Sequence, residues 1–216
     1  ALAGRMPLDR PADAHDIAGT YRITSDHAEM ARVPTDPDQL LDLLRSRHRV
    51  LMAGRPEQRR GEWKIHADRA GGTWFVTPDQ VVGTLRAGFE AGASVRAPFA
   101  RAVYLMFLVS EVHPFADGNG RVTRLMMNAE LVAGGEVRLI IPTVYRNNYV
   151  AALRGATHNG VFDALYATLA FARRYTAQVD FTSRATAERD LVRTNALMDP
   201  SLADADGVRL LLPAKA

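Results

Sequence analysis

The 216-residue chain contains no cysteine. This absence excludes a disulfide framework, a cysteine-ligated zinc site, an iron–sulfur cluster and a cysteine nucleophile. Both structural cross-linking by disulfides and catalysis by a thiolate are therefore ruled out.

Long apolar runs are also absent. The densest one, residues 104–109, is far shorter than the roughly 18 residues that a membrane-spanning helix needs. Residues 1–6 lack the apolar core of a signal peptide. We therefore expect no membrane insertion and no membrane partner. The cytosol is the favoured compartment, and secretion as an effector stays open.

The chain has little excess of either charge. Its 27 Lys and Arg residues face 24 Asp and Glu residues, so the formal net charge is +3. This is too small for bulk attraction to dominate binding to nucleic acid. Basic clusters at residues 45–49 and 55–60 lack interleaved aromatics, which also disfavours a nucleic-acid partner. Five histidines show no metal-ligand spacing, and we interpret them as structural or surface groups: His15, His27, His48, His66 and His158.

With 47% hydrophobic residues, the chain can bury one substantial core. Residues 1–36 show little periodicity and are expected to form an N-terminal arm in which only residues 21–31 could be helical. Residues 37–199 are expected to form one domain. Residues 200–216 look like a loose C-terminal tail.

Apolar periodicity predicts a mostly helical domain. Asp36, Thr77 and Thr143 are candidate N-caps. The double glycine at positions 71 and 72 predicts a hairpin over residues 71–76. The expected helices cover residues 36–51, 77–92, 98–112, 120–134, 143–153, 162–175 and 185–197.

The loop His113-Pro-Phe-Ala-Asp-Gly-Asn-Gly-Arg121 carries the densest chemistry in the chain. Gly118, Asn119 and Gly120 can direct successive backbone N–H groups into one concavity at a helix start, which favours phosphate binding. Arg121 and Arg124 share one helical face and can bind further phosphate oxygens. Taken singly, these residues are ordinary turn and helix-surface residues. Their order indicates an anion site.

Asp117 and His113 complete the pattern. A carboxylate beside phosphates is repulsive unless a divalent cation such as Mg²⁺ lies between them, so Asp117 is the candidate metal ligand. His113, at the end of the preceding helix, can accept a proton from a hydroxyl at neutral pH. Together they predict a phosphoryl- or nucleotidyl-transfer site.

The loop resembles the signature of the Fic family, His-Pro-Phe-x-(Asp or Glu)-Gly-Asn-Gly-Arg followed by a second Arg. A weaker resemblance extends over about residues 40–174. Its landmarks are His48-Arg-Val-Leu-Met52, Gly61-Glu-Trp-Lys64, Phe75-Val-Thr-Pro78 and Arg146-x-x-Tyr149-x-x-x-Leu153. The resemblance implies an all-α Fic fold, a helical bundle around a central helix–loop–helix that bears the motif, with a short β-hairpin flap.

The resemblance also implies an activity, the Mg²⁺-dependent transfer of AMP from ATP to a Ser, Thr or Tyr hydroxyl of a target protein. His113 would be the general base and Asp117 the Mg²⁺ ligand. Phe115 would anchor the loop by packing. The phosphates of ATP would be bound by Gly118, Asn119, Gly120, Arg121 and Arg124.

The predicted hairpin resembles the family's flap, which pairs with an extended target segment. Its Gly72, Thr73, Trp74 and Phe75 would dock the target, although Trp74 and Phe75 could instead be core residues. Candidates for the adenine pocket are Asn148, Asn159 and Tyr149. Tyr149 fits a packing role equally well.

Many family members carry an inhibitory helix with Ser or Thr, three residues, Glu, and then Gly or Asn. Ser25 to Glu29 matches its first part, which makes Glu29 a candidate inhibitory residue, but Met30 stands at the last position. In the family, this glutamate pairs with the second arginine, here Arg124. Inhibition by an antitoxin-like partner, or no inhibition, is equally open.

Other functions of the same site also stay open. The donor could carry UMP or phosphocholine, or the reaction could remove AMP. Relatives that phosphorylate their target depart from Gly-Asn-Gly, which this chain retains. A non-catalytic module that binds nucleotide or a partner is a further alternative, against which the intact His113 and Asp117 speak.

Overall fold

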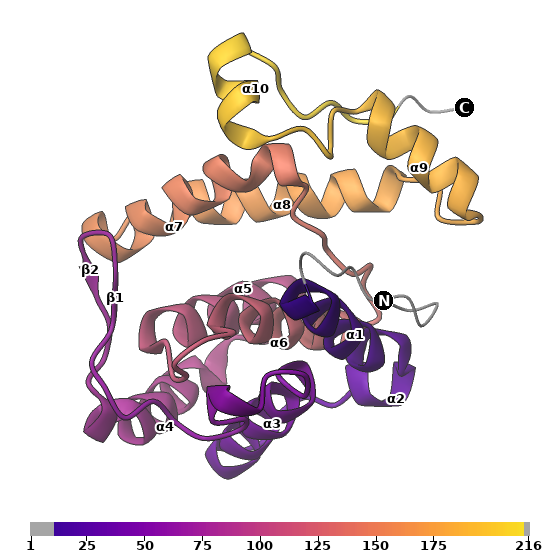
Figure 1. Cartoon of the computed structure of the whole chain (residues 1–216). Helices are drawn as coiled ribbons and strands as arrows, with labels where there is room; N and C mark the ends of the chain where they lie inside the picture. Colours follow the sequence, from indigo (N-terminus) through magenta and orange to yellow (C-terminus); the bar gives the residue numbers. More distant parts are fainter. Residues whose placement is uncertain (1–10, 214–216) are drawn as a thin grey trace. The chain divides into compact units, whose positions relative to one another are not determined.

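The structure is a computed structural model that describes residues 11–213 (Figure 1). Helices and short 3₁₀ turns dominate it, and one two-stranded hairpin interrupts them. The elements are α1 (Pro11–Ser25), α2 (His27–Met30), α3 (Pro37–Leu51), η1 (Pro56–Gln58), β1 (Arg69–Ala70), β2 (Thr73–Trp74), η2 (Pro78–Gln80), α4 (Val81–Ala91), η3 (Gly92–Ser94), α5 (Pro98–Val112), α6 (Asn119–Ala133), η4 (Thr143–Tyr145), α7 (Arg146–Asn159), α8 (Phe162–Gln178), α9 (Arg184–Arg193) and α10 (Pro200–Asp206).

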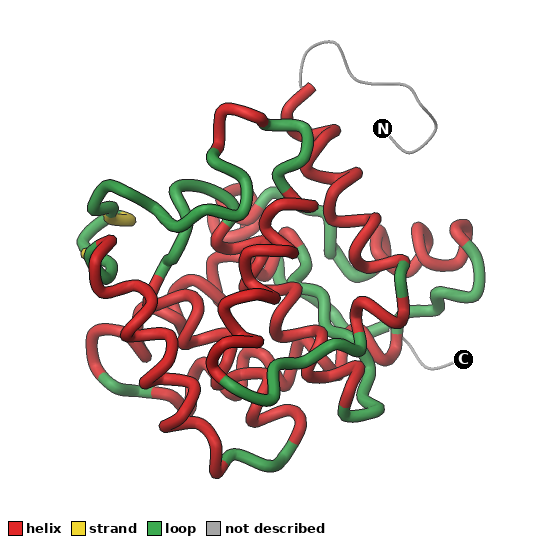
Figure 2. Tube along the Cα trace, turned by 90° about the horizontal axis from the view of Figure 1, so that it is seen from below, coloured by secondary structure: helices red, strands yellow, loops and turns green. Residues whose placement is uncertain are grey.

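The hairpin is the one sheet within residues 11–213, and Figure 2 shows how short its strands are beside the helices. Strands β1 and β2 are antiparallel, with Arg69 opposite Trp74 and Ala70 opposite Thr73. The turn between them is Gly71-Gly72, where Gly71 has a φ of 58°, a conformation that favours glycine. The predicted hairpin and the predominance of helices are both confirmed.

The chain divides between Glu136 and Val137 into two compact units. The first unit contains α1–α6 and the hairpin, and the second contains α7–α10. This division does not coincide with the expected limits at residues 36/37 and 199/200, and a domain over residues 37–199 stays a prediction.

The core of the first unit is built from helices α3–α6. Helix α5 packs along α6, and α4 contacts both α3 and α5. Their apolar stripes bury residues such as Leu44, Leu85, Val109 and Met126 completely. Because α5 and α6 are consecutive and adjacent, the loop between them is held at one end of this core.

The N-terminal segment is more ordered than its sequence indicates. Helix α1 starts at Pro11, whereas we expected helix only over residues 21–31. It packs on α3, where Gly19 comes so close that a Cβ on it would lie 2.4 Å from the Leu51 carbonyl oxygen. Helix α1 therefore depends on tertiary packing, which its weakly periodic sequence does not reveal.

The C-terminal segment is also not a loose tail. Asp199 caps α10 by accepting hydrogen bonds from the Ser201 and Leu202 N–H groups. Ala203 and Leu210 are buried in the core of the second unit. Thr143 is not a helix cap either, because it begins the 3₁₀ turn η4 that precedes α7.

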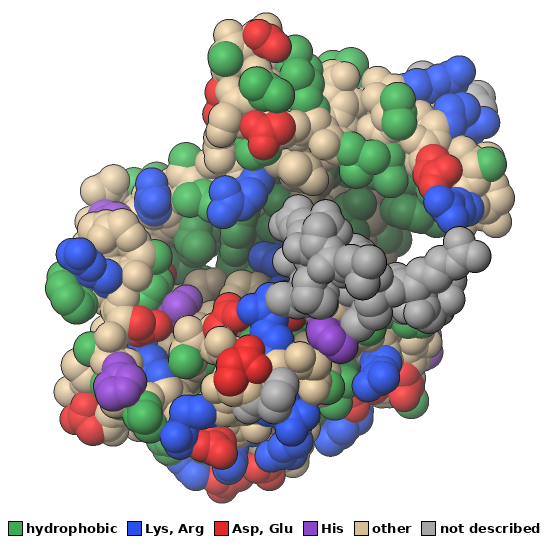
Figure 3. Space-filling model, in the orientation of Figure 1, with side chains coloured by type: hydrophobic (Ala, Val, Ile, Leu, Met, Phe, Trp, Pro, Cys, Tyr) green, Lys and Arg blue, Asp and Glu red, His purple; other side chains and the backbone are tan. Residues whose placement is uncertain are grey.

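No helix within residues 11–213 is long and apolar enough to cross a membrane. On the face shown in Figure 3, Lys and Arg side chains are interspersed with Asp and Glu side chains. This mixture agrees with the small net charge of the sequence.

The cap of α3 offers a direct test of the fold. The Asp36 carboxylate accepts a hydrogen bond of 2.8 Å from the Gln39 N–H, as predicted from the sequence. We expect Asp36→Ala to lower the free energy of unfolding by about 1 kcal/mol, because an N-terminal amide loses its partner. Urea denaturation measures this loss. Asp42→Ala, at an exposed position within α3, is the matched control and should cause no such loss.

Candidate active site

The loop between α5 and α6 owes its path to two residues with left-handed backbone geometry. His113 ends α5 with a φ of 49°, and Pro114 follows it. Gly118 precedes α6 with a φ of 79°, and a Cβ there would lie 3.1 Å from the Met52 sulfur. The chain therefore turns sharply at both ends of the loop, and the N–H groups at the start of α6 face outward from its first turn.

The side chain of Asn119 fixes the centre of the loop. Its Oδ1 accepts from the Phe115 N–H at 2.9 Å, and its Nδ2 donates to the Phe115 carbonyl at 2.6 Å. Phe115 is fully buried and stacks on the His48 ring at 3.8 Å between centroids. Phe115 is thus a packing residue, and contacts within the protein define the loop shape.

His48 of α3 holds the loop from below. Its Nδ1 accepts from the Gly61 N–H at 2.8 Å, so Nε2 carries the proton and donates to the Asp117 carbonyl at 3.0 Å. Burial is the main cause that lowers the pKa of His48 to about 4, and the neutral ring is therefore the folded form. We interpreted His48 as structural or surface from the sequence, and its complete burial confirms the structural interpretation.

His113 is held by residues from the base of the hairpin. Its Nδ1 contacts the Asp68 carboxylate, and its ring stacks on Phe75 at 4.0 Å between centroids. Lys64 in turn donates to Asp68 at 2.5 Å. Burial lowers the pKa of His113, and the hydrogen bond that His113 donates to Asp68 opposes this effect. Sequence reasoning missed Asp68 and Lys64, since no local motif links them to the loop.

A cluster of paired charges lies beside the loop. Asp117 contacts Arg55 at 3.1 Å and Arg121 at 3.2 Å, and Asp16 of α1 lies 2.5 Å from each of these two arginines. Arg55 Nε is buried without a hydrogen-bond partner within the described part of the chain, whereas Arg121 Nη1 makes the 2.5 Å contact with Asp16. An unsatisfied buried donor within a pair of arginines fits an anionic ligand.

The residues present also fit a Mg²⁺ ion. Residues 11–213 contain no group of three or more His, Asp or Glu side chains arranged to hold a metal by themselves. Mg²⁺ commonly uses one or two carboxylates together with substrate phosphates and water. Asp117, whose side chain is 39% exposed beside the first turn of α6, can supply one such carboxylate.

Glu29 lies on α2, and its side chain pairs with two arginines. Its carboxylate binds Arg47 at 3.0 Å and Arg32 at 2.7 Å. Arg47 is buried in α3 and also donates to the carbonyls of Glu29 and Arg32. These contacts fasten α2 to α3, and the inhibitory pairing of Glu29 with Arg124 stays a prediction.

Trp74 and Phe75 of the hairpin, both expected to dock a target, differ in how exposed they are. Trp74 is 69% exposed, which does not fit the core alternative, and Arg69 lies over its ring. Phe75 is half-buried against His113. Gly72 and Thr73 form the turn and the start of β2.

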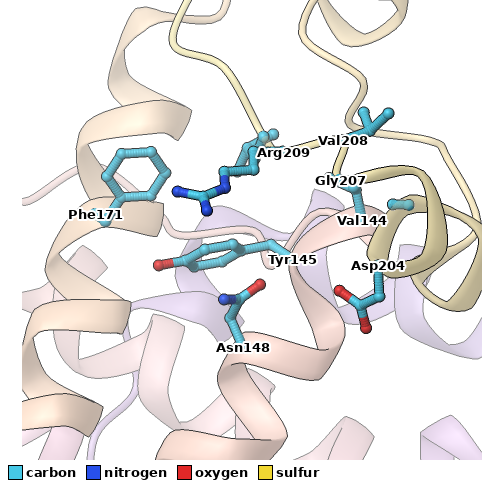
Figure 4. Close-up of a pocket in the computed structure, with 10 residues that line it drawn as sticks. Val144, Tyr145, Asn148, Phe171, Asp204, Gly207, Val208 and Arg209 are labelled. Atoms are coloured by element: carbon cyan, nitrogen blue, oxygen red, sulfur yellow. The ribbon is translucent and has the colours of Figure 1, made fainter.

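The candidates for adenine binding lie in the second unit. Tyr149 is 9% exposed on α7, which favours its packing role, and Asn159 ends this helix. Asn148 lines a pocket of about 640 Å³ together with residues of η4, α8, α10 and the segment after α10 (Figure 4). In the close-up, the Arg209 guanidinium lies near the Tyr145 and Phe171 rings.

Residues 36–131 match the Fic/DOC family. The chain carries a Fic/DOC domain. The protein adenylyltransferase Fic of Drosophila persimilis is 38% identical over 64 residues, which are 30% of this chain and 13% of that protein. The matched segment is thus a small part of this relative's length.

Two solved structures support the fold. Fic-1 from C. elegans has a TM-score of 0.58 and 22% identity, covering 74% of this chain and 47% of that one. A Fic family protein from Desulfovibrio desulfuricans has a TM-score of 0.60 and 18% identity, covering 96% of this chain and 67% of that one. At these identities the likeness shows the fold alone. The predicted Fic fold is confirmed.

The Glu29 contacts predict a structural phenotype. We expect Glu29→Gln to lower the free energy of unfolding by about 1–3 kcal/mol, because the buried Arg47 charge loses its counter-ion. Urea denaturation measures the change. Arg32→Ala removes only the exposed pair and should cost about 1 kcal/mol or less. Equal losses of unfolding free energy in the two variants would contradict a stabilising role for the pair between Glu29 and Arg47.

His48 predicts a pH dependence of stability. Its folded pKa of about 4 lies below the ordinary value of 6.5, so the unfolded chain binds the extra proton between these values. Stability should fall with decreasing pH in this window, by up to about 1.4 kcal/mol per pH unit. Urea denaturation at several pH values should show a shallower dependence in His48→Gln. His66→Gln, at an exposed position, should behave like wild type.

Proposed function

We propose that this chain is a protein adenylyltransferase that transfers AMP from ATP to a hydroxyl group of a target protein. One observation carries the proposal. A single rigid loop joins the imidazole of His113 to the outward-facing N–H groups of the first turn of α6, beside Arg121 and Asp117. Proton acceptor, anion cradle and metal-binding carboxylate are the three parts that nucleotidyl transfer needs.

The Fic/DOC match and the name of the Drosophila relative support the same activity. The relative resembles this chain over 64 residues. The activity of the whole chain, its substrates and its metal therefore belong to the proposal.

In the proposed reaction, His113 accepts the proton of the target hydroxyl through Nε2, since Nδ1 is engaged with Asp68. The hydroxyl oxygen forms a bond to the α-phosphorus of ATP. The bond from this phosphorus to the oxygen that bridges to the β-phosphate breaks, and pyrophosphate leaves. Because burial lowers the pKa of His113, its ring is free of the second proton at neutral pH.

Phosphate binding would fall to the start of α6. The N–H groups of Asn119 and Gly120, the positive end of the helix dipole and the guanidinium groups of Arg121 and Arg124 all favour anions there. The Gly118 N–H donates to Asp117 Oδ1 at 2.6 Å and would exchange this partner for a phosphate oxygen. Asp117 would hold Mg²⁺, which neutralises phosphate charge when bound. The residues present suit a nucleoside triphosphate better than an uncharged donor.

The hairpin would present the target. Its strands are two residues long, and among the described residues β2 pairs with β1 alone, so the outer edge of β2 can accept an extended segment. The exposed Trp74 ring beside this edge offers apolar contact area. Phe75 follows directly and contacts His113, which brings a segment paired with β2 close to the base.

The proposal is tested by incubating the protein with Mg²⁺ and ATP labelled at the α-phosphate, alone and in a cell lysate. We expect protein-bound label from the α position, no label from γ-labelled ATP, and a rate at least about 10²-fold lower in His113→Ala. Label from the γ position would instead indicate phosphorylation. Transfer that survives in His113→Ala would contradict the assignment of the base.

A further inference from the structure

The base of the hairpin holds the imidazole of His113 in one orientation. We propose that Asp68 is a positioning residue that fixes His113 as the tautomer with a proton on Nδ1, and that Lys64 fixes Asp68. The inference deepens the proposed function, on which it rests, because it explains why Nε2 carries the lone pair that takes the substrate proton.

The contact between Asp68 and His113 determines the tautomer. A carboxylate only accepts hydrogen bonds, so the Nδ1 atom that contacts Asp68 must carry a proton. In a neutral ring the other nitrogen, Nε2, is then unprotonated. This is the form that a general base requires.

Asn119 also approaches Nδ1, with its Nδ2 at 3.2 Å. Its orientation is fixed, because Oδ1 accepts from the Phe115 N–H and Nδ2 donates to the Phe115 carbonyl. Nδ2 could serve Nδ1 only if the ring carried its proton on Nε2. The charged Asp68 partner is nearer and forms the stronger bond, so it decides the tautomer.

Lys64 keeps the Asp68 carboxylate in place. Its side chain is 1% exposed, and its Nζ donates to Asp68 at 2.5 Å and to the Val112 carbonyl at 3.3 Å. Its backbone N–H donates to the Pro114 carbonyl at 2.9 Å. Lys64 therefore links the segment before β1 to the residues that precede and follow His113 in the chain.

Phe75 completes the arrangement from the other end of the hairpin. Its ring is nearly parallel to that of His113, at an interplanar angle of 9°, and its N–H donates to the Asp68 carbonyl at 3.2 Å. The residue before β1, Asp68, and the residue after β2, Phe75, thus both contact the imidazole of His113. A target segment that pairs with the hairpin would act on the same residues that orient the base.

Three charged groups influence His113, and they act in different directions. The Asp68 carboxylate, on the segment before β1, raises its pKa, as does the more distant Asp117 in the loop. Lys64 lowers the pKa, and burial lowers it most. Removal of the Asp68 charge should therefore lower the pKa of His113 further.

The tautomer can be measured without any substrate, by ¹⁵N NMR of histidine side chains at neutral pH. We expect the wild-type His113 ring to show a protonated Nδ1 and an unprotonated Nε2. Asp68→Asn should lose this preference, because its amide can donate to Nδ1. Asp79→Asn, at an exposed carboxylate just after the hairpin, should keep the wild-type pattern. A wild-type ring protonated on Nε2 would overturn the inference.

Kinetics of AMP transfer provide the second readout. Asp68→Asn should lower kcat by about tenfold or more, and at most by the ~10²–10⁴-fold expected for loss of the base. In this variant, the acidic limb of the pH profile of kcat should move to lower pH. A general loosening of the fold would not cause this shift. Asp68→Glu should recover part of the rate. An unchanged kcat and pH profile in Asp68→Asn would overturn the positioning role.

The two proposals fail in distinguishable ways. A wild-type protein with Nδ1 protonated that transfers no label contradicts the proposed function, while the contact between Asp68 and His113 stands. Efficient transfer together with an Nε2-protonated ring contradicts only the positioning role.

Discussion

The site depends on hydrogen bonds between side chains and the buried backbone N–H and carbonyl groups of the short loop between α5 and α6. Asn119 bonds both polar groups of Phe115, and His48 joins the Asp117 carbonyl to the Gly61 N–H. A buried polar group without a partner costs free energy, so these bonds hold the loop in a single shape. The geometry of the loop is thereby built into the core.

Two sets of contacts extend outward from this rigid loop. On one side, Asp68, Lys64 and Phe75 connect His113 to the hairpin. On the other side, Arg55 and Arg121 share the carboxylates of Asp16 and Asp117. These pairings compensate the cationic groups close to the proposed phosphate site. Base and anion site are thus supported by different elements around a common centre.

Local signals made much of the fold and the loop predictable. Helix α5 has the predicted bounds because Pro98 opens it and the His113-Pro114 pair closes it. The contacts of Asp68 were not predictable, since its partner His113 lies 45 residues away in sequence and no spacing rule links them. Helix α1 was missed for a similar reason, because the close approach of Gly19 to α3 is a tertiary effect. Sequence reasoning also could not anticipate that Glu29 pairs with Arg47.

The central claim is that the first turn of α6 binds the phosphates of ATP. Backbone ¹⁵N–¹H spectra recorded during a titration with Mg²⁺ and α,β-methylene-ATP test this claim most directly, because they do not depend on a target protein. We expect saturable shifts at the N–H groups of Gly118 and Gly120, and weaker binding in Arg121→Ala. Saturable binding that leaves these two amides unmoved, with wild-type affinity in Arg121→Ala, would contradict it.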